Sequence, residues 1–138
     1  MEAEAADGPN ISFRLKAEAR ARAINKDCTM DTVTDPFILT DWTTIPEVEY
    51  PGESGTAFWR TLQVGNTRIR MVRYSAGYLA DHWCDRGHIV LVLSGELTTE
   101  LNDGSLHRLL PGMSYTVATG RAPHRSRTVD GAVLFIVD

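Results

Sequence analysis

The chain has 138 residues, of which 43% are hydrophobic and 23% charged, and it carries a formal net charge of −4 at pH 7. This composition is typical of a globular domain that is large enough to bury its own core. The negative charge gives no global attraction to nucleic acid or to an anionic membrane surface, and no apolar run approaches the roughly 20 residues that a membrane-spanning helix needs.

The first 29 residues differ in character from the rest. They lack the basic and apolar regions of a signal peptide. Residues 13–26 are charged and alanine-rich, which predicts a helix with Ser12 as its N-cap, but their apolar positions do not form a wide stripe. We therefore expect a helical or disordered extension over 1–29 and a single domain over 30–138. We do not expect a disulfide bridge between Cys84 and Cys28, which lies in this extension. We expect a reduced, cytoplasmic setting.

From Pro36 onward, short runs of aromatic and β-branched residues are separated by Gly, Pro, Asn and Asp. This is the pattern of β-strands joined by turns. The expected strands are residues 56–64, 67–74, 78–84, 88–93, 96–101, 106–110, 114–118, 124–129 and 132–137. Asn102-Asp103-Gly104 and Asp130-Gly131 are interpreted as hairpin turns. Because no helix is expected between the strands, the fold class is an all-β, antiparallel sandwich or barrel.

Two of these strands have informative faces. Along the strand 67–74, one face combines two charged residues with apolar ones: Arg68, Arg70, Val72 and Tyr74. The strand 88–93 is apolar on both faces, which predicts that both are covered. A second sheet would cover one face, and N-terminal strands or a partner subunit would cover the other, so the pattern is compatible with a homodimer.

The stretch from Asp81 to His88 contains the strongest functional signal. His82 and Cys84 are two residues apart, so they share one face of an extended strand. A turn through residues 85–87 would bring His88 beside them. Imidazole and thiolate together suit a borderline or soft metal ion. His124, at the start of a later strand, completes the set only if the fold brings the two regions together.

The spacing of these residues resembles the two motifs of the cupin family. Gly77-x4-His82-x-Cys84-x3-His88-x6-Gly95 resembles the first motif, with Cys84 in place of its second histidine and His88 in place of its glutamate. Pro111-Gly112 and Pro123-His124 resemble the second motif. With Asp81-His82-Trp83-Cys84, residues 36–138 resemble the small single-domain cupins called DHCW-motif cupin fold proteins.

This resemblance implies an antiparallel double-stranded β-helix, the cupin jelly-roll barrel. It also implies a metal ion held by His82, Cys84, His88 and His124. The thiolate and the missing carboxylate favour zinc, with nickel, copper and iron left open. If all four residues bind, the site is closed and tetrahedral; if one does not, an open position can bind water or substrate.

Residues around these ligands are candidates for a substrate pocket, namely Tyr78, Tyr115 and Arg125. Arg121, Arg125 and Arg127 could form a positive rim that steers a carboxylate or phosphate, although exposed charges on a strand are the commoner explanation. His107 is expected on a solvated strand face. The sequence identifies no general base, so the catalytic residues are unknown.

Two functions remain open. One is a metal-dependent enzyme that acts on a small molecule through an open coordination position. The alternative is a non-catalytic, metal-stabilised binding or redox-sensing module in which Cys84 is the sensitive ligand. A third hypothesis is a metal-free barrel in which the histidines have only a packing role. We expect a small-molecule ligand as the partner, and we expect no binding to nucleic acid or to membranes.

Overall fold

The computed structural model describes residues 37–138, and almost all regular structure in this range is β-strand. A short 3-10 turn, η1 (Trp42–Thr44), comes first. Nine strands follow: β1 (Val48–Pro51), β2 (Thr56–Val64), β3 (Thr67–Tyr74), β4 (His88–Gly95), β5 (Leu97–Leu101), β6 (Leu106–Leu109), β7 (Ser114–Val117), β8 (His124–Arg127) and β9 (Ala132–Val137). The predicted helix over 13–26 and the predicted boundary after residue 29 lie outside the described residues.

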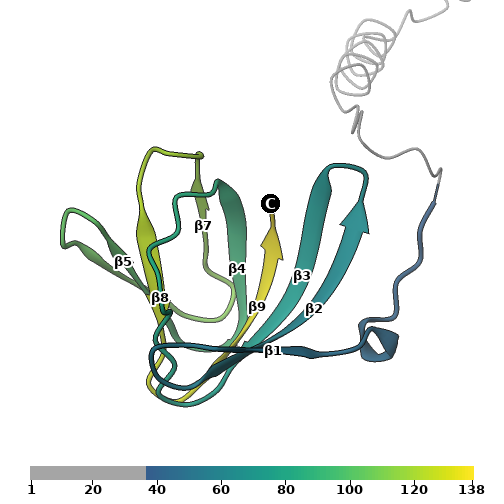
Figure 1. The fold of residues 1–138 in the computed structure, drawn as a ribbon, viewed down its shortest axis with the longest axis horizontal. Coiled ribbons are helices and arrows are strands. Elements are labelled where there is room, and N and C mark those ends of the chain that lie inside the picture. Colours follow the sequence, from purple (N-terminus) through teal and green to yellow (C-terminus); the bar gives the residue numbers. More distant parts are fainter. Residues whose placement is uncertain (1–36) are drawn as a thin grey trace, which may run out of the picture. The chain divides into compact units, whose positions relative to one another are not determined.

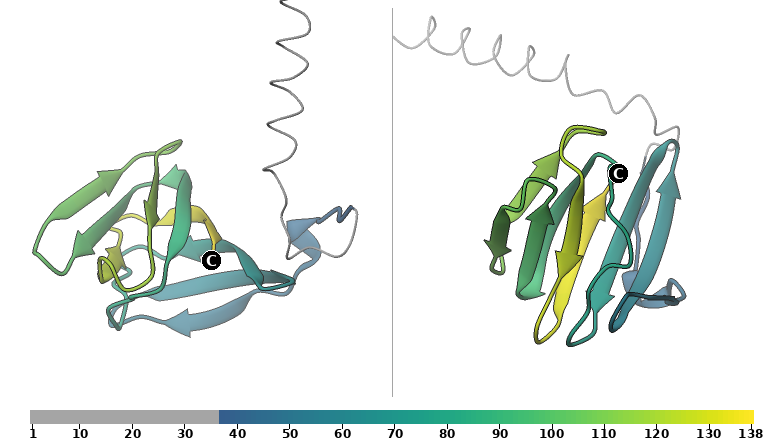
Figure 2. Two further views of the ribbon diagram at one scale, coloured as in Figure 1. Left: turned by 90° about the horizontal axis from the view of Figure 1, so that it is seen from above. Right: turned by 60° about the vertical axis from the view of Figure 1, so that its left-hand side comes forward.

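The strands form two antiparallel sheets. The larger sheet has the order β1-β2-β3-β9-β4-β7, and the smaller has the order β6-β5-β8 (Figure 1). Figure 2 shows the smaller sheet facing part of the larger one, with chain crossings between them. This is the predicted all-β jelly roll, with strands distant in sequence, such as β3, β9 and β4, lying side by side.

The predicted strand bounds agree with the observed ones where a short turn joins two neighbouring strands. The strands β2, β3 and β9 begin and end at the predicted residues. Gly65, with a φ of 57°, closes the β2–β3 hairpin at the predicted turn. The hairpin predicted at residues 102–104 is confirmed, because β5 and β6 pair across it. The strand β1 was not predicted; it pairs with β2 at the edge of the larger sheet.

Two predictions are wrong. Residues 130–131 do not close a hairpin, because β8 pairs with β5 whereas β9 pairs with β3 and β4. The chain changes sheet there. Residues 78–84 are not a strand; this segment makes only isolated bridges, at Leu79 and at Cys84. It connects β3 to β4, both in the larger sheet, and on the way it runs beside β8 of the smaller sheet, which it meets only at single bridges.

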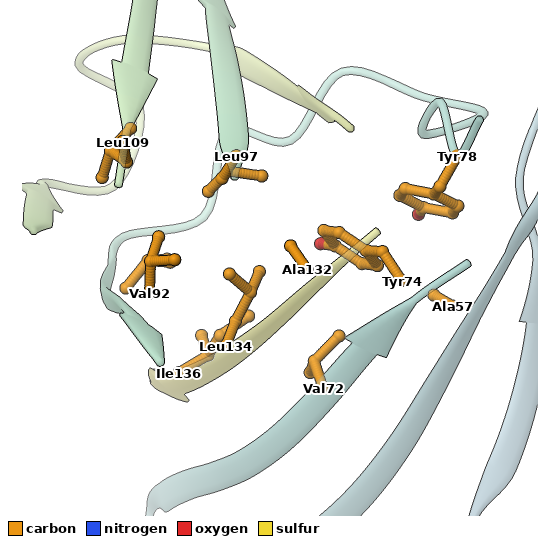
Figure 3. Close-up of a cluster of buried hydrophobic side chains, with 11 residues drawn as sticks. Ala57, Val72, Tyr74, Tyr78, Val92, Leu97, Leu109, Ala132, Leu134 and Ile136 are labelled. Carbon is orange, nitrogen blue, oxygen red and sulfur yellow. The ribbon is translucent and has the colours of Figure 1, made fainter. Parts of the chain in front are cut away.

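The core lies between the two sheets. Alternate residues of β9 are buried, as expected for a strand with one face inward, and Leu134 is 1% exposed. Figure 3 shows these side chains and those of β3 and β4 facing Leu97 and Leu109 of the smaller sheet. The rings of Tyr74 and Tyr78 stack at 4.1 Å between centroids. Together these contacts hold the two sheets in a fixed relation.

The two faces of β4 differ. Val90 and Val92 point inward and are buried, whereas Ile89 is 48% exposed and Leu93 is 42% exposed. Within residues 37–138 of a single chain, the second sheet thus covers one face of β4 and nothing covers the other. Cover by a partner subunit stays a prediction. Within the same range, no helix is long and apolar enough to cross a membrane.

Candidate metal centre

Three side chains of the predicted ligand set come together. Cys84 lies in the segment that connects β3 to β4, His88 is the first residue of β4, and His124 is the first residue of β8. Their ligand atoms all lie within 4.8 Å of one another. One thiol and two imidazoles, drawn from three separate parts of the chain, thus form a compact donor cluster.

Backbone pairing aligns Cys84 with His124. The Cys84 amide donates to the His124 carbonyl at 2.8 Å, and the His124 amide donates to the Cys84 carbonyl at 2.9 Å. Two residues that exchange both hydrogen bonds lie directly opposite each other, and their side chains leave the backbone on the same side. This single bridge replaces the strand face that the sequence predicted, and it brings the thiol to the imidazole.

A second contact sets the tautomer of His124. Its ring is buried, and its Nδ1 lies 2.9 Å from the carbonyl oxygen of Ala122. A carbonyl can only accept, so Nδ1 carries the proton and Nε2 keeps its lone pair. That Nε2 faces the Nε2 of His88 at 2.8 Å. Metal-binding histidines are commonly oriented by a backbone carbonyl in this way.

His88 is held in the neutral state. Burial, followed by repulsion from the charged form of His124, lowers the pKa of His88 to about 4. A neutral imidazole has a lone pair available for a metal ion at physiological pH. The hydroxyl of Tyr115 lies 3.3 Å from His88 Nε2. Among residues 37–138, His88 Nδ1 is buried without a hydrogen-bond partner, and the contact with the lone pair of His124 Nε2 is a hydrogen bond only when His88 Nε2 carries the proton, which a bound metal ion would displace.

His82, the fourth predicted ligand, is not part of this cluster. Its side chain is 73% exposed, and its Nδ1 lies 2.6 Å from a carboxylate oxygen of Asp81. The expected strand that would have placed His82 and Cys84 on one face is absent. His82 does line the same cavity as the other three residues. Its role as a ligand stays a prediction.

The donor cluster borders a cavity of about 290 Å³. Its wall includes the three residues predicted to line a substrate pocket, Tyr78, Tyr115 and Arg125. Burial raises the pKa values of Tyr78 and Tyr115, so both phenols stay protonated and can donate hydrogen bonds. Whether any of these three residues contacts a ligand stays a prediction.

Arg125 is already compensated by acidic neighbours. Its guanidinium lies 3.1 Å from a carboxylate oxygen of Glu100 and 3.7 Å from one of Glu53. It also lies over the ring of Trp83, 5.0 Å from the centroid. Arg121 and Arg127 are exposed and do not line the cavity. The three arginines therefore do not form one positive rim around the site.

Other charged residues in the cavity wall were missed by the sequence analysis. Arg68 and Arg70 of β3 both donate to the side chain of Asp138, whose carboxylate is fully buried. Arg70 itself is only 5% exposed. The available signal was the face of β3 on which these two arginines share the apolar side with Val72 and Tyr74. His107, as predicted, is exposed on its strand.

Solved structures with a similar fold include members of the cupin superfamily. A predicted oxalate decarboxylase from Thermotoga maritima matches with a TM-score of 0.63 and 13% identity, over 72% of this chain and 96% of that chain. Ectoine synthase from P. lautus matches with a TM-score of 0.60 and 19% identity, over 73% and 76%. The fold is a cupin fold.

A sugar phosphate isomerase of the cupin superfamily from Silicibacter pomeroyi is also similar, with a TM-score of 0.57 and 18% identity over 72% of this chain and 74% of that chain. No protein-family model and no curated protein matches the sequence significantly. Identities this low show the cupin fold and leave the activity open, because one fold hosts many functions. The activity must therefore be argued from the cavity and its donor cluster.

Proposed function

We propose that this chain is a metal-dependent cupin that acts on a small molecule, with Cys84, His88 and His124 as the metal ligands. The observation that carries this proposal is the convergence of the three donor atoms, within 4.8 Å of one another, at the wall of a cavity. Three protein ligands beside an accessible space are typical of catalytic metal sites, which keep one position open. Membership of the DHCW-motif cupins is part of the same proposal.

The donor set fits a divalent transition metal. The contact with Ala122 leaves the Nε2 lone pair of His124 facing the other two donors. The low pKa of His88 keeps its imidazole neutral. A thiolate with two imidazoles favours zinc as the first choice, with nickel, copper or iron as alternatives. When bound, such an ion would supply Lewis acidity toward an oxygen atom of water or substrate.

Residues of the chain itself would position the substrate. The Tyr115 hydroxyl remains protonated because burial raises its pKa, and it lies 3.3 Å from His88 Nε2. It can therefore donate a hydrogen bond to an acceptor bound beside the donor cluster. The buried walls that Val90 and Leu134 contribute to the cavity would exclude bulk water from that place.

Elemental analysis of the full chain, purified without a histidine tag, tests this proposal. We expect about one transition-metal ion per chain. The variants Cys84→Ala, His88→Ala and His124→Ala should each lose it, whereas His107→Ala, at an exposed histidine outside the cavity, should retain it. Equal metal content in all four variants would contradict the proposal.

A second function rests on the accessibility of the thiol. Cys84 is partly exposed, lines the cavity and has no disulfide partner among residues 37–138. In a redox-sensing module, oxidation of this ligand would release the metal without turnover. Peroxide treatment of the metal-loaded chain, followed by metal analysis of the wild type and of a Cys28→Ser variant, would test this. Retention of the metal after oxidation of Cys84 would exclude the sensing function.

A further inference from the structure

Several buried N–H groups near the candidate metal centre have no acceptor. Among residues 37–138, the Nε atoms of Arg70 and Arg125 and the Nε1 atom of Trp59 are buried without a hydrogen-bond partner. All three residues line the cavity. These atoms can only donate hydrogen bonds. Because buried polar groups are nearly always satisfied in native proteins, unpaired donors at a cavity wall need acceptor atoms from the water or ligand that fills the cavity.

The charged side chains of the same cavity wall also favour a ligand with acceptor atoms, because arginines outnumber their carboxylate partner there. Arg70 donates to Asp138 Oδ2 at 3.0 Å, and Arg68 donates to both carboxylate oxygens of Asp138, at 2.9 and 2.6 Å. Two guanidinium groups therefore share one side-chain carboxylate, and Arg86 lines the same cavity, so this wall carries an excess of positive charge. Arg70 is 5% exposed, so this charge is not screened by bulk water. Arg125, in contrast, has two carboxylates of its own.

Trp59 holds the guanidinium of Arg70 in place. The Cζ atom of Arg70 lies over the Trp59 ring, 4.4 Å from its centroid. The register of β2 with β3 keeps the two residues close, because Trp59 pairs with Val72 and Arg70 is two residues away on the same face. With its ring contact and its bond to Asp138, Arg70 is fixed in orientation before any ligand enters.

We propose that Arg70 and Trp59 form an anion subsite for the carboxylate group of the small molecule that binds in this cavity. The planar guanidinium suits the planar geometry of a carboxylate, which can accept two parallel hydrogen bonds from it. That the same ligand also reaches the donor cluster rests on the proposed function. The anion subsite itself does not require the metal.

Binding of small carboxylates tests the subsite. Acetate and succinate would be titrated into the full chain by calorimetry at constant ionic strength, with inorganic phosphate as a separate arm. Arg70→Gln should weaken carboxylate binding by about tenfold or more, the effect of losing a charge-assisted hydrogen bond. Arg73→Gln is the matched control, because Arg73 lies on the same strand, is exposed and does not line the cavity.

A measurement on the wild-type chain removes any dependence on the folding of the variant. The Nε–H resonance of Arg70, assigned through its own side chain, should shift in a saturable way as acetate or succinate is added. The corresponding resonance of Arg73 should not shift. An Arg70 resonance that does not respond to either carboxylate would overturn the proposal, and so would a response to phosphate alone.

The same titrations in chelator-treated protein separate this inference from the proposed function. A saturable shift at Arg70 in a chain that never holds stoichiometric metal would support the subsite and contradict the metal centre. Stoichiometric metal without any response at Arg70 would support the metal centre and overturn the subsite. A metal content of Arg70→Gln equal to that of the wild type, together with lost carboxylate binding, is the result we expect.

Discussion

Cys84 and His124 exchange both of their backbone hydrogen bonds, at 2.8 and 2.9 Å, and so form an isolated antiparallel bridge. Their side chains leave this bridge on the same side, toward His88 at the start of β4. This bridge joins the segment between β3 and β4 to the start of β8 and positions a thiol beside two imidazoles.

Replacement of the thiol should weaken metal binding strongly. Cys84→Ser keeps the size of the side chain but removes the soft donor. We expect the metal affinity to fall by more than the roughly 10- to 100-fold that loss of an outer-shell partner typically costs. Competition with a chromophoric chelator would measure this affinity, with His107→Ala as the control. An unchanged affinity would remove Cys84 from the ligand set.

Replacement of His82 should have a much smaller effect. His82 is exposed and lies against Asp81, apart from the three clustered donors. We therefore expect His82→Ala to keep about one metal ion per chain, with an affinity that falls by less than about tenfold, the factor that corresponds to 1.4 kcal/mol. Loss of the metal in this variant would show a four-ligand, closed site and would count against an open coordination position.

Acid should destabilise the fold through Asp138. Burial raises the pKa of Asp138, but the hydrogen bonds from Arg68 and the charges of Arg70 and Arg68 outweigh it, and the net pKa is lowered. A carboxyl with a lowered pKa in the folded state stabilises the fold above its unfolded-state pKa. That stabilisation is lost as the pH falls through the folded value.

Urea unfolding of Asp138→Asn at several pH values would measure this contribution. At neutral pH we expect a loss of about 3 kcal/mol in the free energy of unfolding, because the variant leaves the buried Arg70 without its partner. The loss should shrink as the pH falls below the usual range for an aspartate. A difference from the wild type that does not change with pH would contradict this account.

A core substitution tests how the two sheets are joined. Leu97 of β5 is fully buried against the larger sheet, so Leu97→Ala should lower the free energy of unfolding by about 2–5 kcal/mol. Leu106→Ala, on the neighbouring strand β6, is the matched control, because Leu106 is 54% exposed. Its effect should stay within about 0.5 kcal/mol. Equal effects of the two substitutions would contradict the packing described here.

Local signals in the sequence predicted much of the fold. The alternation of residues and the turn at Gly65 fixed the bounds of β2 and β3, because a hairpin depends on neighbours in the chain. The predicted hairpin at residues 130–131 failed for the opposite reason. A glycine turn shows that the chain reverses, but it does not show which sheet receives the next strand.

The site was predicted in part. Motif spacing singled out Cys84, His88 and His124, which the fold brings together, but their meeting depends on a bridge between residues 40 positions apart. Spacing alone also suggested a strand face for His82 that does not exist. The cluster of Arg70 and Asp138 was missed, because 68 residues separate the two partners and no local pattern links them.

X-ray absorption spectroscopy of the tag-free, full-length chain after metal loading tests the central claim most directly. The account predicts about one metal ion per chain, bound by one sulfur and two imidazole nitrogens; for zinc, these distances are about 2.3 Å and 2.0–2.1 Å. A protein that stays folded with a chelator and never holds stoichiometric metal would contradict the account. So would a bound ion that has no sulfur ligand.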